Sequence, residues 1–479
     1  MEIVCSDKTQ IYNFSERGDF ILDSRILNGK KHIHFIGIGG SGMYPLAQIL
    51  HSKGYYLTGS DNNETETLKA VREMGIPVTL GQAAENIEGA DLIVHTAAIM
   101  ADNPELIAAK ASGVPVLERS ELLGLVTSWY DNAVCVSGTH GKTTTSSMLT
   151  QILLEAGVDA SAVIGGKLPL IGGSGRVGST DTMVCEACEF VDTFLKLYPD
   201  ISVILNIDAD HLDYFKTVDN IIKSFAKFAH NTTKTIIVNG DDDNSMRAVE
   251  EELEDKKIIT FGFGKDNEYY PENIRQISGF NTEFSLMRNG EKLSDISIFV
   301  PGIHNVLNAV AACAAAIECG VEPKDLAAGL KNFRGAGRRF ELLAEINGIT
   351  IADDYAHHPA ELTVTLNAAK NMNFKRVWAV FQPFTFSRTK LLLNEFAASL
   401  KIADKVVMTE IMGSREKNVD GIHTSDLAKE IPGSVWFDSF ERVAQYVVDN
   451  AESGDLVITL GCGDVYKVAK IIIEKLNDK

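Results

Sequence analysis

The sequence predicts an α/β protein of three domains, in which two Rossmann-like α/β domains flank a central phosphate-loop domain with a mostly parallel sheet. The 479 residues exceed what one core usually holds, and length alone suggests about three domains. Two glycine-rich segments, 37–42 and 138–143, each follow an apolar strand-like run and precede a helix-compatible stretch. Strand-like and helical lengths then alternate to the end, so we place the domains at 1–131, 132–335 and 336–479.

Composition and charge exclude several classes of protein. A hydrophobic content of 45% with 23% charged residues is that of an ordinary globular protein, and no apolar run reaches bilayer length, so we expect no membrane insertion. Residues 1–30 lack a secretory hydrophobic region, and seven cysteines without regular spacing fit reduced thiols, so we expect a cytoplasmic protein. The formal net charge of −20 opposes nucleic-acid binding, because that affinity needs clustered Lys and Arg.

The first glycine-rich segment has the spacing of a Rossmann-type turn. It follows the strand-like run 32–36 and precedes a helix expected over 43–53. Asp61 follows a second strand-like run, 55–58, at the distance of a ribose contact. The fingerprint does not distinguish a nicotinamide cofactor from another nucleotide with a diphosphate, because the glycines contact only the pyrophosphate. Its three glycines are Gly37, Gly39 and Gly42.

The second segment predicts a binding site for nucleotide phosphates, and therefore ATP as a ligand. It lies between the apolar run 133–136 and a helix expected over 143–156. Lys142 supplies a positive charge for the terminal phosphates, and Thr143 offers a hydroxyl to Mg²⁺. The usual phosphate loop has a glycine where this chain has Val136, so the loop is a shortened variant. Its residues are Gly138, Thr139, His140, Gly141, Lys142 and Thr143.

Acidic and imidazole side chains follow two central strands, at positions expected to face the phosphate loop. Glu186 ends the run 183–185, and His211 comes shortly after the run 203–206. Open α/β sheets place their chemistry at this end of the strands, where a carboxylate and a neutral imidazole can hold Mg²⁺. In the alternative interpretation, His211 caps or packs a helix and Glu186 pairs with Lys142.

The rest of the central domain contains a glycine cluster and an alanine-rich helix. Six glycines between positions 165 and 178 have the composition of a mobile surface loop beside a site. His304, Asn305 and Asn308 stand at spacings that share one face at the start of a helix expected over 305–319, and amides suit an adenine edge. The alternative is an ordinary helix start with Asn as its cap.

The third domain concentrates polar residues where a strand ends. His357 and His358 precede Pro359, which is suited to the first turn of a helix. Such polar density suggests a site. Arg388 follows another strand-like run, 377–381, and suits a bidentate grip on a carboxylate, although taken alone it reads as a surface charge. In the alternative interpretation the two histidines bind a metal, but no third ligand is obvious in the sequence.

Four motifs, in this order, resemble those of the Mur ligase family of ATP-dependent amide-forming enzymes. The resemblance extends from Ile33 to Asp464. Within the family, segments 35–43 and 353–359 are similar to the member that acts on UDP-N-acetylmuramate and L-alanine. The four motifs are 138–144, Asn206 with 210–213, Gly302-x-His304-Asn305-x-x-Asn308, and 354–357.

The resemblance implies a reaction and its ligands. L-alanine would be joined by an amide bond to the carboxylate of UDP-N-acetylmuramate through an acyl phosphate, in peptidoglycan precursor synthesis, with ATP and Mg²⁺ and without hydride chemistry. A sister ligase that attaches a preformed peptide to the same sugar shares nearly all of these motifs. An NAD-dependent Rossmann dehydrogenase would leave the phosphate loop unexplained, and a nucleotide-gated binding protein would show no phosphate release that depends on an amino acid.

The resemblance also implies roles for individual residues. The UDP-sugar site would comprise Gly37, Gly39, Gly40, Ser41, Gly42, Ser60, Asp61, Thr96 and Arg119. ATP would contact Gly138, Thr139, His140, Gly141, Lys142, Thr143, Thr144, His304, Asn305, Asn308, Arg338, Arg339 and Asp354. Mg²⁺ would be coordinated by Thr143, Glu186 and His211, and the amino acid framed by His357, His358 and Arg388. The catalytic residues would be Lys142, Glu186, His211, His357 and Arg388. Two positions depart from the family pattern: Phe384 replaces a common His, and Cys188 replaces a common Asp.

Overall fold

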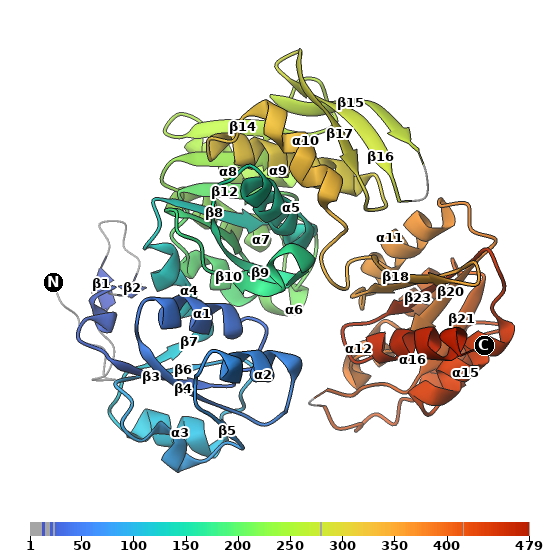
Figure 1. Cartoon of the computed structure of the whole chain (residues 1–479), viewed down its shortest axis with the longest axis horizontal. Helices are drawn as coiled ribbons and strands as arrows, with labels where there is room; N and C mark the ends of the chain where they lie inside the picture. Colours follow the sequence, from blue (N-terminus) through green and yellow to red (C-terminus); the bar gives the residue numbers. More distant parts are fainter. Residues whose placement is uncertain (1–11, 15–19, 23, 278–279, 415, 479) are drawn as a thin grey trace. The chain divides into compact units, whose positions relative to one another are not determined.

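The computed structural model describes residues 12–14, 20–22, 24–277, 280–414 and 416–478, and it confirms the predicted α/β fold class (Figure 1). Most of residues 1–30, on which the expectation of no secretory leader rests, lie outside these ranges. The chain divides into two compact units, one formed by 1–272, 285–295 and 307–330, the other by 273–284, 296–306 and 331–479. In the described part of the chain, no helix combines the length and apolar character that a membrane span requires.

The first unit contains a five-stranded parallel sheet in the order β5-β4-β3-β6-β7 (Figure 1). Alternate residues of the central strand face opposite layers: Phe35 packs in one hydrophobic cluster with Leu50 and Leu68, and Ile36 packs in another with Ala109. Helices therefore cover both faces, as in a Rossmann-like domain. The strands are β3 (His32–Ile36), β4 (Tyr56–Asp61), β5 (Val78–Leu80), β6 (Leu92–His95) and β7 (Val116–Glu118), and the helices are α1 (Tyr44–Ser52), α2 (Glu66–Glu73), α3 (Pro104–Ala111) and α4 (Arg119–Thr127). A separate antiparallel pair comprises β1 (Tyr12–Phe14) and β2 (Phe20–Leu22).

A second, ten-stranded sheet has the order β10-β9-β11-β8-β12-β13-β14-β15-β16-β17. Its strands run parallel from β9 to β15, as predicted for the central domain, and β10 is antiparallel to β9. The strands are β8 (Asn132–Ser137), β9 (Ser161–Leu168), β10 (Gly173–Arg176), β11 (Thr182–Glu186), β12 (Ile201–Ile204), β13 (Thr235–Asn239), β14 (Lys257–Phe261), β15 (Tyr269–Gln276), β16 (Thr282–Arg288) and β17 (Glu291–Ile298). The accompanying helices are α5 (Lys142–Glu155), α6 (Leu212–Phe215), α7 (Val218–Asn231), α8 (Asp243–Val249), α9 (His304–Glu318) and α10 (Pro323–Asn332).

The glycine cluster between positions 165 and 178 is not the mobile loop that the sequence predicts. Gly165 and Gly175 lie in the paired strands β9 and β10. A Cβ atom on Gly165 would lie 2.3 Å from Oε1 of Glu186, and one on Gly175 would lie 2.5 Å from Cβ of Pro45. Glycine is needed here because other groups approach the backbone closely, a reason that composition cannot distinguish from flexibility.

The second unit contains a six-stranded sheet in the order β18-β19-β23-β20-β21-β22, parallel except for β18. Phe381 packs with Leu362 of α11 on one face, and Trp378 packs with Val447 of α15 on the other, so this domain is also Rossmann-like. The strands are β18 (Glu341–Ile346), β19 (Ile349–Asp354), β20 (Arg376–Phe381), β21 (Lys405–Thr409), β22 (Val435–Phe437) and β23 (Asp455–Leu460). The helices are α11 (Pro359–Lys370), α12 (Phe386–Leu391), α13 (Leu393–Leu400), α14 (Thr424–Lys429), α15 (Phe440–Asn450) and α16 (Tyr466–Asn477).

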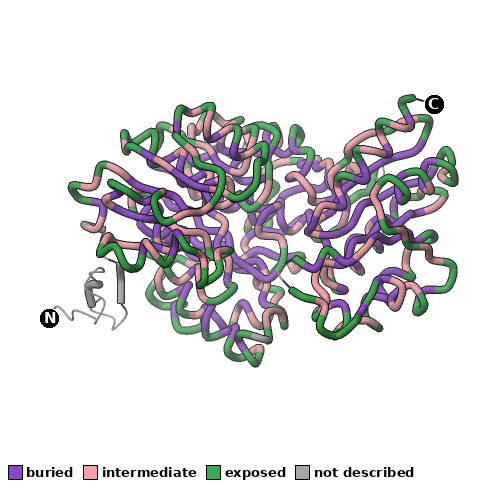
Figure 2. The backbone as a smooth tube through the Cα atoms, turned by 90° about the horizontal axis from the view of Figure 1, so that it is seen from below, coloured by how far each residue is buried: buried purple, intermediate pink, exposed green. Residues whose placement is uncertain are grey.

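Burial follows the sheets. The central strands β3, β8 and β23 are almost entirely buried, and Figure 2 shows buried stretches of backbone in the interior with exposed residues concentrated at the periphery. In the first unit one hydrophobic cluster contains both Leu50 of α1 and Met183 of β11, so the first two sheets share a continuous core. The domain limits at 131/132 and 335/336 stay a prediction.

Candidate functional site

The phosphate loop connects β8 to α5 by a turn that only glycine makes without strain. Gly138 has a φ of 137° and Gly141 a φ of 88°. A Cβ atom on Gly141 would also lie 2.5 Å from Oδ1 of Asn308, the residue of α9 that the sequence places near the nucleotide. Because the first N–H groups of a helix have no partner within it, the start of α5 presents donors and a partial positive charge to an anion.

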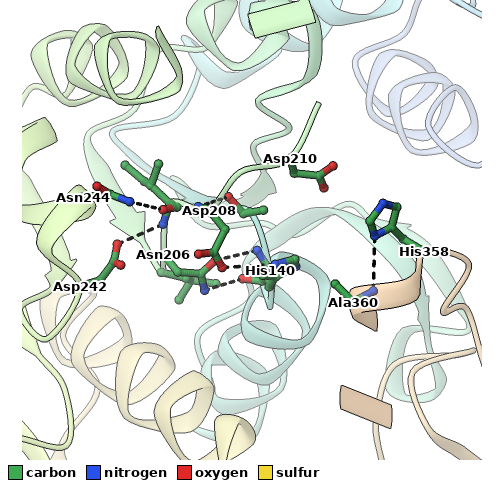
Figure 3. A network of polar contacts seen from close by, with 12 residues as sticks. His140, Asn206, Asp208, Asp210, Asp242, Asn244, His358 and Ala360 are labelled. Atoms are coloured by element: carbon green, nitrogen blue, oxygen red, sulfur yellow. Dashed lines mark hydrogen bonds and ion pairs between the residues drawn. The ribbon is translucent and has the colours of Figure 1, made fainter. Parts of the chain in front are cut away.

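Asn206, which lies two residues beyond the neighbouring strand β12, holds this loop in place (Figure 3). Its backbone carbonyl accepts the N–H of Thr139 at 2.9 Å, and its side-chain Oδ1 accepts the N–H of His140 at 2.8 Å. Its Nδ2 donates to the carbonyl of His140 at 3.1 Å, while the N–H of Asp208 donates to Oγ1 of Thr139 at 2.9 Å. Asn206 belongs to a motif that the sequence shows, but only the structure reveals that it shapes the loop.

A further layer of side chains fixes the segment that carries Asn206. Asn239 donates to the carbonyl of Leu205 at 3.0 Å. Asp242 accepts the N–H of Ile207 at 3.1 Å, and Asn244 donates to the carbonyl of the same residue at 2.9 Å (Figure 3). The backbone behind the loop is therefore satisfied by fixed partners and can hold the loop rigidly.

Lys142 lies inside the loop as a buried, paired cation. Its Nζ donates to the carbonyls of Gly138 at 2.6 Å and Thr139 at 3.1 Å, and lies 2.9 Å from Oε2 of Glu189. The two charged side chains are only 15% and 3% exposed. Burial opposes the charge on Lys142, but the neighbouring carboxylate of Glu189 outweighs it and raises the pKa of Lys142. The ammonium is therefore charged at neutral pH before any nucleotide arrives.

Glu189 is a residue that the sequence-based interpretation missed. The alternative interpretation paired Lys142 with Glu186, yet the hydrogen-bonded partner is Glu189, three residues later. Glu186 ends β11 and accepts the N–H of Gly165 at 2.9 Å. The recurrence of acidic residues after β11 was a usable signal, but the choice between them depends on how the chain turns after the strand.

His211 lies in a segment with strained backbone, next to Phe190. It starts α6 with a φ of 53°, and its ring centroid lies 4.6 Å from that of Phe190. Val191 and Asp192, which follow Phe190, have φ values of 54° and 57°. A β-branched residue rarely takes this left-handed conformation, and such strain clusters at functional sites. The ring of His211 is engaged in packing, in line with the alternative interpretation, and this does not test a role toward Mg²⁺.

The donor set near the loop fits Mg²⁺ better than a metal held by protein alone. In the described ranges, no three His, Cys, Asp or Glu side chains converge as a metal cage. Thr143 lies in the first turn of α5, and Glu186 stands in register with Val136 at the end of the adjacent strand β8. Mg²⁺ commonly takes one or two protein oxygens and completes its shell with water and phosphate, which a hydroxyl and a carboxylate allow.

The first glycine loop is anchored to the end of β4. The carbonyl of Ser60 accepts the N–H of Gly37 at 2.8 Å and of Ile38 at 3.0 Å, and Asp61 accepts the N–H of Gly39 at 3.0 Å. Gly37 has a φ of 83°. The hydroxyl of Ser60 is fully buried and donates to Glu105, so in this structure the residue meets the loop through its backbone.

Other predicted sugar-nucleotide residues surround the same turn. A Cβ atom on Gly37 would lie 2.7 Å from Cγ2 of Thr96, and one on Gly42 would lie 3.0 Å from Cδ of Arg119. The carbonyl of Ser41 accepts the hydroxyl of Ser174 at 3.0 Å, and Gly40 donates to the carbonyl of Gly37. Arg119 also lines a small cavity with Glu186, so the predicted sugar-nucleotide and metal residues meet in the first unit.

The predicted nucleotide residues at the start of α9 have different surroundings. Asn308 belongs to the first unit, beside Gly141, whereas His304 and Asn305 belong to the second. Asn305 donates to the carbonyl of Pro301 at 2.6 Å, and its N–H donates to the carbonyl of Gly302, which is a local turn at a helix start.

In the second unit, the side chains of Asp354 and Arg338 form hydrogen bonds with other residues of that unit. The Asp354 carboxylate accepts the N–H groups of Phe340 at 2.7 Å and Ala356 at 2.8 Å, and burial raises the pKa of Asp354 to about 6. Arg338 pairs with Asp353 at 2.8 Å and donates to carbonyls of the 461–463 turn. Both side chains therefore stabilise the end of β19.

The predicted amino-acid residues lie near the start of α11. Burial lowers the pKa of His357, whose Nδ1 lies 3.2 Å from Oε2 of Glu361. His358 caps the helix, accepting the N–H of Ala360 at its Nδ1 at 3.4 Å. Phe384 stands edge-on to His357, with ring centroids 6.3 Å apart. Arg388 lies in α12, and its positive charge acts on the same imidazole.

Arg339 and Thr144 complete the predicted set. The guanidinium of Arg339 lies 5.2 Å from the ring centroid of Tyr355, over its face, and its charge counteracts the raised pKa of Asp354. Thr144 lies in the first turn of α5, directly after Thr143.

These features define a nucleotide-dependent ligase class, and the chain belongs to the Mur ligase family. Residues 32–130 match the family's catalytic domain, residues 136–316 match the Mur ligase middle domain, and residues 338–463 match the Mur ligase glutamate ligase domain.

Individual relatives are similar over almost their whole length. A UDP-N-acetylmuramate--L-alanine ligase from Lachnospira eligens is 45% identical, covering 93% of this chain and 99% of its own, and one from Agathobacter rectalis is 44% identical, covering 93% and 98%. The crystal structure of a UDP-N-acetylmuramate-alanine ligase from Thermotoga maritima matches with a TM-score of 0.79 at 27% identity, covering 94% of this chain and 99% of its own. A murein peptide ligase from Psychrobacter arcticus, at 24% identity and a TM-score of 0.71, shares the fold.

Proposed function

We propose that this chain is an ATP-dependent ligase that joins L-alanine to the carboxylate of UDP-N-acetylmuramate, with release of ADP and phosphate, in peptidoglycan precursor synthesis. The observation that carries the proposal is the buried ammonium of Lys142 inside a glycine-built loop, in the same unit as a second glycine loop without a cation. The similarity to UDP-N-acetylmuramate--L-alanine ligases at 44% and 45% identity supports the choice of substrates.

The chemical difficulty is that a carboxylate and the terminal phosphate of ATP repel each other. Lys142 lowers this repulsion, so the sugar carboxylate attacks the γ-phosphorus and ADP leaves, which forms an acyl phosphate. The amine of L-alanine then attacks the carbonyl carbon, and phosphate leaves. Mg²⁺, bound by Thr143, Glu186 and His211 in this proposal, adds charge neutralisation when present.

The second unit supplies groups suited to the amino acid. His357 is neutral at neutral pH because burial lowers its pKa, so it can accept the proton that the alanine ammonium must lose. Arg388 suits the alanine carboxylate. We assign adenosine to His304, Asn305, Asn308 and Asp354, and the γ-phosphate to Arg338 or Arg339, on the resemblance alone. The cytoplasmic location also stays a prediction.

Phosphate release tests the proposal. Purified protein with ATP, Mg²⁺ and UDP-N-acetylmuramate should release phosphate when L-alanine is added, and much less with glycine, L-serine or a tripeptide. A preference for the tripeptide would identify the sister ligase instead. No release with any acceptor would refute the ligase assignment, and a nicotinamide fluorescence titration checks the dehydrogenase alternative.

A further inference from the structure

A buried set of polar side chains lies behind the first glycine loop. Apart from Ser60, which the resemblance places in the UDP-sugar site, the reaction above does not use it. Nε2 of His34 lies 2.7 Å from Oε1 of Glu105, and the hydroxyl of Ser60 lies 2.7 Å from the other oxygen of that carboxyl group. All three residues are at most 1% exposed. They come from β3, α3 and β4, so a single cluster joins the central strand, its neighbour and a covering helix.

The set continues toward the surface through two more side chains. Nδ1 of His34 lies 2.7 Å from Oγ1 of Thr58, and Nε2 of His32 lies 2.8 Å from the same oxygen. Nδ1 of His32 lies 2.8 Å from the carbonyl oxygen of Gly89, which can only accept a hydrogen bond. Five hydrogen bonds therefore run in one chain from Gly89 to Ser60.

Counting hydrogens shows that this chain of side chains holds one proton more than the form with two neutral imidazoles and an ionised Glu105. Each of the five contacts needs one hydrogen between its two atoms. Neutral His32 and His34, together with the hydroxyls of Thr58 and Ser60, supply four, and an ionised Glu105 supplies none. A fifth proton must be bound if all five contacts are hydrogen bonds. It can reside on either imidazole or on the carboxyl group.

The pair of His34 and Glu105 is the favoured place for this proton. If His32 carried it, the positive charge would be three hydrogen bonds away from a fully buried carboxylate, which costs more than an adjacent pair. The other charged groups nearby already have backbone donors. Asp91 accepts the N–H groups of Lys31 and His32 at the start of β3, and Asp61 accepts that of Gly39 at the end of β4.

The pair is connected to the glycine loop through Ser60. The hydroxyl of Ser60 is tied to Glu105, and its carbonyl accepts the N–H groups of Gly37 and Ile38. We propose that Glu105 and His34 share one buried proton and act as positioning residues, which hold Ser60 and thereby the loop in the geometry that receives a nucleotide diphosphate. This inference rests on the proposed function only in naming the diphosphate of a UDP-sugar as the ligand of that loop.

The proton count can be measured without any substrate. Nitrogen-15 NMR of histidine-labelled protein at neutral pH should show both ring nitrogens of His34 protonated, or carbon-13 NMR should show a protonated Glu105 carboxyl. The Glu105→Gln variant supplies the fifth hydrogen from its amide without a charge, so His34 should then show a bare Nε2. A bare ring nitrogen on His34 beside an ionised Glu105 in the unmodified protein would overturn the proposal.

Ligand binding tests the positioning role. Calorimetry should show UDP affinity lowered about tenfold by Ser60→Ala and by Glu105→Leu, restored to within about threefold in Glu105→Gln, with ATP affinity unchanged in all three. The Ser60→Ala variant guards against misfolding, because it removes one hydroxyl and keeps the buried pair. Ser112→Ala, at the end of the same helix α3, is the matched control.

Two outcomes contradict the positioning role: unchanged UDP affinity in Ser60→Ala, or an equal loss of ATP affinity. If the unmodified protein binds no UDP, the diphosphate assignment fails together with this positioning role. The NMR result still decides where the proton lies, so it separates the proton count from the proposed function.

Discussion

The two glycine loops of the first unit share a plan and differ in charge. Each follows a central parallel strand and precedes a helix, with glycines at positive φ. The segment 37–43 has no titratable side chain and is anchored by Ser60 and the carboxylate of Asp61. The segment 138–144 contains His140 and Lys142 and is anchored by an amide, Asn206. In the proposed reaction the first loop only holds a diphosphate, whereas the second must stabilise a phosphoryl group in transfer, which requires a cation.

Removing Lys142 should have the largest effect of any change to the two loops. Lys142→Ala should lower kcat at least about 100-fold, a loss on the order of 3 kcal/mol of transition-state stabilisation, because no other Lys or Arg lies inside the loop segment. UDP affinity should stay unchanged. Lys69→Ala, which alters an exposed lysine on α2, is the control for purification and folding. Near-normal turnover by Lys142→Ala would refute the role given to the second loop.

The partner of Lys142 offers the next largest effect. Glu189→Gln should lower the free energy of unfolding of the nucleotide-free protein by about 2 kcal/mol, because it leaves a buried ammonium without its counter-charge. The raised pKa of Lys142 means that this stabilisation is complete at neutral pH and is lost only as the pH rises through that value. Saturating ATP should reduce the difference, since phosphate replaces the carboxylate. Urea unfolding of the variant and of the unmodified protein, with and without ATP, measures this difference in the free energy of unfolding. The same difference with and without ATP would contradict the pairing of Glu189 with Lys142.

Matched glycine substitutions test whether the two loops act independently. Gly37→Ala and Gly141→Ala each place a Cβ atom within 2.7 Å of a neighbour at a φ above 80°. Each should raise the KM of its own nucleotide about tenfold and leave the other unchanged, because strain of this kind costs about 1–3 kcal/mol. Gly54→Ala has a similar φ with open space around it, so it controls for backbone strain without a clash. A shared effect on both KM values would show that the loops are not independent.

The smallest expected effect concerns pH. A hydrogen bond to Asp208 raises the pKa of His140, so the second loop gains a positive charge as the pH falls through that value. ATP affinity should therefore increase a few-fold on acidification, by screening of phosphate charge, while UDP affinity should not follow the same curve. The His140→Gln variant should lose the dependence. Calorimetric titrations of both nucleotides across neutral pH measure this dependence. An unaltered pH curve in the variant would exclude His140 as the group that causes it.

Local patterns predicted most of the framework. The run 133–136 and the helix over 143–156 correspond to β8 and α5 with a shift of one residue at each end, because buried apolar runs and glycine turns are local signals. The strands β15, β16 and β17, which extend the central sheet, were not predicted. Exposed positions interrupt the apolar pattern in β15 and β17. The glycine cluster was misread because composition does not show which groups approach a backbone.

The candidate site, like the fold, could be predicted only in part. The two loops, their charges and the family could be predicted from the sequence alone, since spacing along one strand-loop-helix unit decides which N–H groups and which ammonium can meet a phosphate. Only the tertiary structure decided that Glu189 pairs with Lys142, that Asn206 holds the loop, and that Glu105 reaches Ser60 across the sheet. These contacts join residues between 45 and 66 positions apart, and their strength comes from burial and short distance, which no local pattern encodes.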